Sequence, residues 1–267
     1  MPSKKKESAS FKIQSNDGYV TDHKKIAEIL NKTFNDVCDI LSQELPTLIN
    51  SVDSMHTLNA TENEFKFSEI SEEFVLNELQ NLDVRKAVGV DGLNLRLLKT
   101  AAEFITKPLT VLFNRSVSTG QLPHEFKVAK IIPIHKGGSY EPENFRPISL
   151  LPSLSKILEK AVHQQLYCYL NDNGLLSDRQ SGFRPLHSTS TCLTEIVDFL
   201  LDNMNSKQLT GSIFLDLRKA FDVIPLNLIL EKMKYYGIRN SELEWFTRYL
   251  MNRQQCVSIQ YFAEYYI

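Results

Sequence analysis

The sequence carries almost no net charge: 30 basic side chains stand against 32 acidic ones over 267 residues, a balance of −2. Composition therefore gives no sign of a nucleic-acid-binding protein, and any surface that binds phosphates has to be local. A local excess of this kind lies between residues 127 and 156, which hold five basic and two acidic residues. The basic residues are Lys127, Lys130, Lys136, Arg146 and Lys156.

Cysteine is scarce as well. The four cysteines, at positions 38, 168, 192 and 256, lie far apart, with no Cys-x-x-Cys pair and no histidine at zinc-finger spacing. This pattern favours reduced thiols in an intracellular protein over disulfides or a zinc site. The opening MPSKKKESAS lacks the apolar core of a signal peptide, and no apolar run is long enough to span a membrane. The lysines at 4–6 are a weak nuclear signal, with a solvated tail as the alternative, so we expect the nucleus or the cytoplasm.

The first part of the chain predicts a tail followed by helices. Residues 1–20 are polar and predict a disordered basic tail, whereas the apolar spacing from Thr21 predicts an amphipathic helix and 46–66 a linker. Ser71 predicts the cap of a helix that the KAVGVDG segment at 86–92 interrupts. Further helices are expected from Asn94, from Pro108 to Gly120, from Ser153 or Ser155 to Gly174, from Ser188–Ser190, from Pro225 to Tyr236 and from Ser241 to Met251.

Strands are fewer and gather late in the chain. VAKIIPI at 128–134 is β-branched and turns at Gly137-Gly138 into a second extended stretch from Arg146 to Leu151. GSIFLDL at 211–217 predicts a buried strand by its continuous apolar run, and CVSIQYF predicts another. The predicted fold class is therefore α+β, and the length suits one large or two modest domains.

The sharpest chemical feature is FLDLRKAFD at 214–222, where an apolar strand delivers Asp216 at or near its end. A P-loop ATPase also places an aspartate after such a strand, but the chain has no Gly-x-x-x-x-Gly-Lys-Ser/Thr. A phosphatase with an aspartyl nucleophile would need a second aspartate two positions on, where Arg218 stands. For Asp216 taken alone, the cap of a turn remains the favoured interpretation.

A series of segments changes this interpretation of Asp216. In the same order along the chain, these segments resemble those of the reverse transcriptases of non-LTR retrotransposons of the jockey-like, long interspersed element type. The resemblance covers about residues 22–260. The segments are KAVGVDG (86–92), AKIIPIHKGG (129–138), NFRPISLLPSLSKILEK (144–160), QSGFRPLHST (180–189), FLDLRKAFD (214–222), YYGI (235–238) and WFTRYLMNRQQCV (245–257).

The resemblance implies a right-hand polymerase fold that copies RNA into DNA. After the tail (1–20) come a helix and linker (21–66), the fingers (67–210) and the start of the palm (211–267). The implied partners are an RNA template, a DNA primer and deoxynucleoside triphosphates, with no membrane and no clear protein partner. The implied cofactor is Mg²⁺, which prefers hard oxygen ligands.

The same resemblance implies roles at the palm. Asp216 matches the first catalytic aspartate, a ligand to both metal ions, and the carbonyl of Leu217 matches a backbone metal ligand on the nucleotide side. Phe221 matches the steric gate that clashes with a ribose 2′-OH, and Ala220 leaves room for the sugar. A core position is the alternative for Phe221.

In the fingers, Lys136 and Arg146 match the residues that hold the incoming triphosphate, with Lys a point charge and Arg a bidentate fork. A solvated hairpin tip is the alternative for both. The loop that carries the template matches four residues, and the aromatic pair Trp245-Phe246 is expected in the core. The template-loop residues are Gln180, Gly182, Phe183 and Arg184.

The chain departs from the family pattern in several places. It has no Asp-Asp dipeptide, whereas the family has an aromatic-x-Asp-Asp box, and it lacks the Pro-Gln-Gly-rich segment. Arg218 stands where a small Ser is usual, and Ile224-Pro225-Leu226 where Asp-His is usual. We therefore expect a fragment truncated within the palm and inactive by itself. The alternative is a non-catalytic module that binds RNA or a nucleotide.

Overall fold

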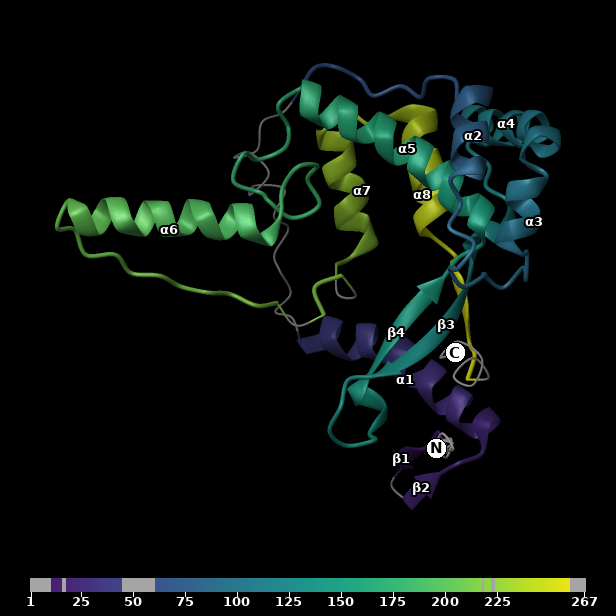
Figure 1. Cartoon of the computed structure of the whole chain (residues 1–267), viewed down its shortest axis with the longest axis horizontal. Helices are drawn as coiled ribbons and strands as arrows, with labels where there is room; N and C mark the ends of the chain where they lie inside the picture. The colour runs from purple at the N-terminus through teal and green to yellow at the C-terminus, as the bar shows by residue number, and fades with distance from the viewer. Residues whose placement is uncertain (1–10, 16–17, 45–60, 218, 222–223, 260–267) are drawn as a thin grey trace, which may run out of the picture.

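The computed structural model describes residues 11–15, 18–44, 61–217, 219–221 and 224–259 (Figure 1). This part mixes helix and sheet, as the α+β class predicts, and none of its helices is long and apolar enough to cross a membrane. The helices are α1 (His23–Glu44), α2 (Glu72–Gln80), α3 (Leu95–Thr100), α4 (Ala102–Thr119), η2 (His124–Lys127), η3 (Pro142–Asn144), α5 (Ser153–Asp172), α6 (Thr189–Asn205), α7 (Leu226–Tyr235) and α8 (Asn240–Leu250). The strands are β1 (Ile13–Ser15), β2 (Gly18–Val20), β3 (Val128–His135), β4 (Phe145–Leu150) and β5 (Gln254–Val257).

A three-stranded sheet with the order β4-β3-β5 lies below α5 in Figure 1. β3 and β4 form an antiparallel hairpin in which Ile132 pairs with Ile148. On its other edge β3 pairs in parallel with β5, where Val128 lies opposite Gln254. The two strands expected at 128–134 and from Arg146 are therefore confirmed. The late strand expected over CVSIQYF lies at 254–257 and so overlaps the expected range only at Cys256 and Val257.

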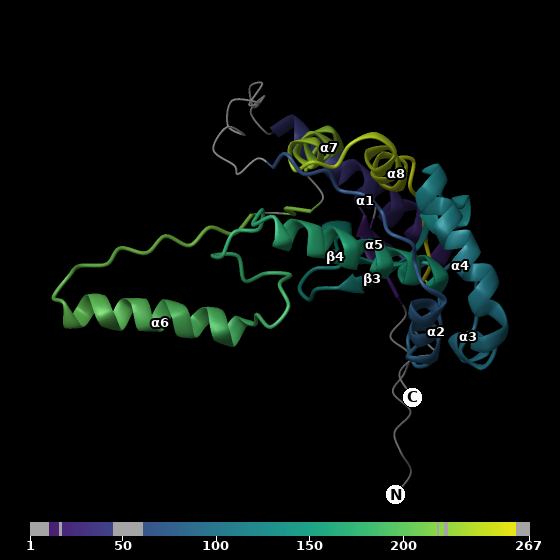
Figure 2. The same ribbon diagram turned by 90° about the horizontal axis from the view of Figure 1, so that it is seen from above.

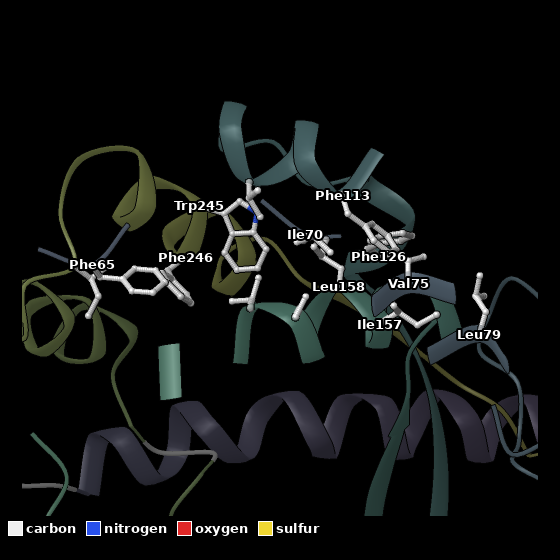
Figure 3. Packing of buried hydrophobic residues seen from close by; sticks show 14 of the residues in the cluster. Phe65, Ile70, Val75, Leu79, Phe113, Phe126, Ile157, Leu158, Trp245 and Phe246 are labelled. Carbon is white, nitrogen blue, oxygen red and sulfur yellow. The ribbon is translucent and has the colours of Figure 1, made fainter. Parts of the chain in front are cut away.

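The main core lies among α2, α4, α5 and α8 (Figure 3). Trp245 and Phe246 are 1% and 6% exposed, which confirms the expectation for this pair. The indole of Trp245 donates to Ser116 Oγ at 3.1 Å, so its polar atom is satisfied inside the core. Fifteen residues form this cluster: Phe65, Ile70, Val75, Leu79, Ala102, Phe113, Val117, Phe126, Ile157, Leu158, Ala161, Val162, Ile238, Trp245 and Phe246.

Most of the helix ends follow the caps that the sequence predicts. The hydroxyl of Ser71 accepts the amide of Phe74 at 3.1 Å, and Ser188 forms a reciprocal capping box with Thr191. Gly120 ends α4 in the left-handed conformation, with φ +68°. The expected start at Pro108 is wrong, because α4 begins at Ala102 and contains the proline. A proline inside a helix removes one backbone hydrogen bond, and here the surrounding packing keeps the helix continuous.

An extended segment before α2 runs through the core. The side-chain amide of Asn114 bonds both the amide and the carbonyl of Ile70, at 2.8 and 2.9 Å. Gln165 holds Ser68 in the same two-sided way, at 2.8 and 3.1 Å. The interpretation of 46–66 as a linker therefore does not extend to Phe65, which is 2% exposed. Residues 45–60 lie outside the described part of the chain.

The YYGI segment forms a crowded junction with this extended segment. The hydroxyl of Tyr169 lies 2.7 Å from the carbonyl oxygen of Asn63 and 2.8 Å from that of Tyr236. The amide of Phe65 donates to the carbonyl of Gly237 at 3.0 Å. Gly237 has φ +83°, and a Cβ built on it would lie 2.2 Å from the Asn63 carbonyl oxygen. Only glycine fits this position, because any side chain would collide with the backbone.

The expectation of a disordered tail over 1–20 is wrong for residues 11–15 and 18–20, while the other residues of this range lie outside the described part of the chain. Residues 13–15 and 18–20 form the antiparallel pair of β1 and β2, and Ile13 is fully buried. Ile13 joins Ile26 and Leu30 of α1 in a second apolar cluster with Phe145 and Ile259. Phe11 and Ile13 alternate with Lys12 and Gln14 over only four residues, so the sequence pattern is too short to reveal the burial of Ile13.

The strand expected over 211–217 is wrong. This segment is extended but belongs to no strand, and Ile213 and Leu215 are 88% and 85% exposed. It follows α6, which buries none of its residues and projects from the helical body in both views (Figures 1 and 2). A strand needs a partner for its amides and carbonyls, and no strand among the described residues pairs with this one.

A carboxyl group is largely buried between α5 and α8. Burial raises the pKa of Glu159, against a hydrogen bond from Tyr249 and the positive charges of Arg253 and Lys156. Burial, followed by the charge of Glu159, raises the pKa of Tyr249 to about 12. Arg253 donates to the Tyr249 carbonyl at 2.9 Å and lies over its ring, 4.9 Å from the centroid. The cluster links α5 to the turn that leads into β5.

We predict that Gly237→Ala lowers the free energy of unfolding by about 2–3 kcal/mol, because the methyl group would force apart the junction with Asn63 and Tyr169. Gly174→Ala is the matched control, since Gly174 also has positive φ but its Cβ would meet nothing within 4 Å. The control should lose only about 1 kcal/mol. Urea unfolding of both variants provides the comparison, and equal losses would contradict the steric explanation.

We predict that Glu159→Gln stabilises the protein at neutral pH relative to the unmodified chain. Because burial raises the pKa of Glu159 above its ordinary value of 4.5, its stabilisation is present below that value and is lost as pH rises through the raised one. In urea unfolding, the unmodified chain and Glu159→Gln should be about equally stable at pH 4, and Glu159→Gln should be the more stable of the two at pH 7. Glu231→Gln, on the exposed side of α7, controls for the lost charge; an equal pH-dependent gain there would refute the prediction.

Candidate nucleotide-binding site

The β3–β4 hairpin carries the two basic residues that the resemblance assigns to the triphosphate. Ile134 pairs with Arg146, and the amide of Lys136 donates to the carbonyl of Asn144 at 2.8 Å, one pair beyond the strands. Paired residues, and residues two apart on one strand, share a face of the hairpin. Lys136 and Arg146 therefore lie on opposite arms and on the same face of the hairpin.

This face is open to solvent. Arg146 and Lys136 are exposed, and Ile134 and Ile148 beside them are 41% and 44% exposed. Lys136 Nζ donates to the carbonyl of Glu143 at 3.3 Å. On the opposite face Ile131 and Phe145 are buried, at 1% and 3% exposed, whereas Pro147 and Ser149 of β4 are exposed. The hairpin thus offers a lysine and an arginine on one accessible face, a donor set suited to phosphate oxygens.

Two glycines make the turn between the arms. Gly137 and Gly138 have φ +98° and +81°, and a Cβ on either would meet nothing within 4 Å. Backbone conformation, and not crowding, therefore requires glycine at this turn. The reversal carries Lys136 to the end of one arm and lets η3 (Pro142–Asn144) lead back into β4.

Asp216 lies in the extended segment after α6, and its carboxylate is exposed, as expected. Leu215 and Leu217, on either side of Asp216, are 85% and 74% exposed, so they do not anchor a strand. No group of three or more histidine, cysteine, aspartate or glutamate side chains gathers into a metal site among the described residues. A pair of Mg²⁺ ions needs several hard oxygen ligands, so this part of the chain does not fit a two-ion centre. Arg218, Asp222 and the closing YFAEYYI lie outside the described residues.

The loop between α5 and α6 holds the four residues implied for the template. Gln180 Nε2 donates to the carbonyl of Gly182 at 3.0 Å, and Arg184 Nη1 donates to that of Ser177 at 3.0 Å. These bonds brace the loop internally. Phe183 has φ +60° and is 84% exposed, so the loop presents its ring to solvent.

The structure brings this loop to the segment after Asp216. The rings of Phe183 and Phe221 meet edge to face, with their centroids 5.8 Å apart. Phe221 is 80% exposed, which excludes the alternative of a core position, while Ala220 beside it is half-buried. The residue implied as the steric gate and a residue implied for the template are therefore neighbours.

Other parts of the implied site are not joined. No hydrogen bond or ion pair links Asp216 to Lys136 or Arg146 within the described part of the chain. By contrast, KAVGVDG meets the segment after β4, since a Cβ on Gly89 would lie 2.7 Å from Pro152 N and 2.8 Å from the Leu151 carbonyl oxygen. The sequence pattern did not reveal an aromatic cluster at the hairpin loop, formed by His135, Tyr140 and Phe145. The signal in the sequence was the presence of rings on both sides of Gly137-Gly138, which could have predicted this cluster.

Comparison with known proteins finds relatives that match this part of the chain in sequence. The family model described as reverse transcriptase (RNA-dependent DNA polymerase) matches residues 134–266. In Drosophila melanogaster, the probable RNA-directed DNA polymerase from transposon BS is 31% identical over 180 residues, 64% of this chain and 20% of that protein. The corresponding protein from transposon X-element is 35% identical over 167 residues, 60% of this chain and 18% of that protein. The RNA-directed DNA polymerase from mobile element jockey is 34% identical over 157 residues, 58% of this chain and 17% of that protein.

This chain carries a reverse-transcriptase domain of the jockey-like, non-LTR retrotransposon type. It spans about a fifth of the length of the curated relatives it matches. The matched range of this reverse-transcriptase domain begins at Ile134 and so takes in Lys136, Arg146, the template loop and Asp216. Helices α2 and α4 precede that range but contribute five residues to the main core cluster on which the domain rests.

Proposed function

We propose that the chain is the fingers and the start of the palm of an enzyme that copies RNA into DNA, and that the β3–β4 hairpin holds the triphosphate of the incoming deoxynucleotide. The observation that carries the proposal is the placement of Lys136 and Arg146 on one open face of one hairpin. A guanidinium and an ammonium group on one face can bind neighbouring phosphate oxygens together.

The second element of the proposal is the aromatic contact near Asp216. We propose that Phe221 is the steric gate, with Ala220 beside the sugar, and that Phe183 lies on the template side with Gln180, Gly182 and Arg184. The edge-to-face contact of Phe183 and Phe221 supports this, because it brings the residue implied as the gate next to one implied for the template side. A ring beneath the sugar would reject a ribose 2′-OH by collision.

We further propose that the 267 residues by themselves bind nucleotides without joining them. Asp216 would supply one carboxylate shared by both ions, Leu217 would supply one carbonyl to the ion on the nucleotide side, and the sequence has no Asp-Asp dipeptide. Two divalent cations about 3.5–4 Å apart repel each other unless several carboxylates and phosphates surround them. Mg²⁺ therefore belongs to the proposal only as the ion that accompanies the triphosphate.

We predict that Lys136→Ala and Arg146→Ala each weaken binding of dTTP to this chain by about 10- to 100-fold, the usual range for a lost bond to a charged group. Isothermal titration provides the measurement. Arg146→Lys should recover only part of the affinity, because lysine lacks the bidentate fork. Both side chains are exposed, so urea unfolding should be unchanged.

Lys107→Ala, an exposed lysine on α4 away from the hairpin, is the control for net charge. If it weakened dTTP binding as much as Lys136→Ala, attraction by the whole protein would explain the affinity, and the hairpin site would be refuted. Unchanged binding in Lys136→Ala and Arg146→Ala would refute it as well.

We predict that the 267-residue chain gives no primer extension above background on an RNA template, with Mg²⁺ or with Mn²⁺. Loss of a single preorganised transition-state contact typically costs about 10²–10³-fold in rate, and here several metal ligands are lacking. Asp216→Ala is the control for contaminating polymerase. Template-dependent incorporation that Asp216→Ala abolished would mean that the described residues hold the metal ions after all.

A further inference from the structure

The loop between the hairpin arms is held from outside by the first described residues of the chain. The backbone amide of Gln14, in β1, donates to the carbonyl of Tyr140 at 2.7 Å. In an antiparallel pair, alternate residues direct their amides away from the partner strand, and Gln14 uses this outward amide. Figure 1 shows β1 and β2 beside the end of the hairpin.

Side chains reinforce this backbone bond. The ring of Phe11 meets that of Phe145 edge to face at 5.5 Å, one residue before Arg146. The ammonium group of Lys12 lies 4.3 Å from the centroid of Tyr19 and 5.2 Å from that of Tyr140. Within the loop, the ring of Tyr140 stacks on that of His135 at 4.6 Å, so the contact reaches the residue before Lys136.

The segment that makes these contacts is itself anchored. Ile13, Ile26 and Leu30 are fully buried in the cluster that includes Phe145. Further along α1, Asn31 and Asn35 both accept from Gln255 Nε2, at 3.2 and 2.9 Å, which ties the helix to β5. The β1–β2 hairpin therefore lies between a fixed helix and the loop.

We infer that residues 11–15 and 18–20 act as a clamp on the loop of residues 136–144, and that Phe11, Lys12 and the backbone amide of Gln14 position Lys136 and Arg146. The two glycines allow the loop many conformations, and the clamp selects the one that leaves both basic side chains on one face. The segment lies outside the range of the family match, which begins at residue 134. The effect on the triphosphate rests on the proposed function, whereas the clamp itself rests on the contacts.

The test compares Gln14→Pro with Gln14→Ala in the full chain. Proline removes the amide that bonds Tyr140, whereas alanine keeps it, and the side chain of Gln14 is exposed in either case. An edge strand tolerates proline where the amide does not serve the ladder. Hydrogen exchange is read at the amides of Lys136 and Asn144, which bond the carbonyls of Asn144 and Glu141. Amides in the middle of α5 serve as the internal reference.

We expect Gln14→Pro to speed exchange at Lys136 and Asn144 by about three- to tenfold relative to α5, and to weaken dTTP binding by a similar factor. Gln14→Ala should change neither. Phe11→Ala, which alters no charge, should reproduce both effects, so that weaker binding cannot be ascribed to a lost lysine. A general loss of stability would instead accelerate exchange equally at the amides of α5.

Unchanged exchange at Lys136 and Asn144 in both Gln14→Pro and Phe11→Ala would overturn the clamp. Faster exchange with unaltered dTTP binding, in a chain whose binding depends on Lys136, would overturn the positioning role. If the unmodified chain does not bind dTTP at all, the proposed triphosphate site falls, and the positioning role falls with it. The exchange result then decides the clamp alone.

Discussion

The rest of the candidate site depends on the pairing of β3 on both of its edges. One edge pairs with β4, its neighbour in the chain, and the other pairs in parallel with β5. A parallel pair needs a long crossover, and this one runs through α5, α6, α7 and α8. Because both edges of β3 are bonded, the hairpin is held to the helical body while one of its faces stays open. The exposed positions of Lys136 and Arg146 follow from this arrangement.

Two apolar clusters hold the hairpin from different directions. The main cluster joins α2, α4, α5 and α8 and includes Trp245, while the smaller one joins α1 to Phe145 and Ile259. Each cluster depends on residues that precede the range of the family match, since Val75 and Leu79 belong to the first and Ile26 to the second. The polymerase-like part of this chain is therefore stabilised by what comes before it.

The segment that carries Asp216 differs from the hairpin in its degree of packing. Its apolar side chains are exposed, and α6 before it buries no residue. Burial of such side chains is the main driving force of folding, and an extended segment without it has little to fix its conformation. The contact between Phe183 and Phe221 is the link described between this segment and the template loop. The residues proposed for the triphosphate and the residue implied for the metal ions thus lie in parts of the chain that differ in how much of their surface is buried.

The sequence by itself determined what depends on local interactions. The caps at Ser71 and Ser188, the C-cap at Gly120, the glycine turn after Lys136 and the period of α1 all act within a few residues. Only the tertiary structure decided which segments meet, and so it reversed the expectations for residues 11–20, for Phe65 and for 211–217. Ile13 is buried because α1 and Phe145 cover it, whereas the apolar run at 211–217 is exposed because no described strand pairs with it. Whether a residue is buried depends on contacts with segments distant in the sequence, and the local pattern of its own segment does not specify those contacts.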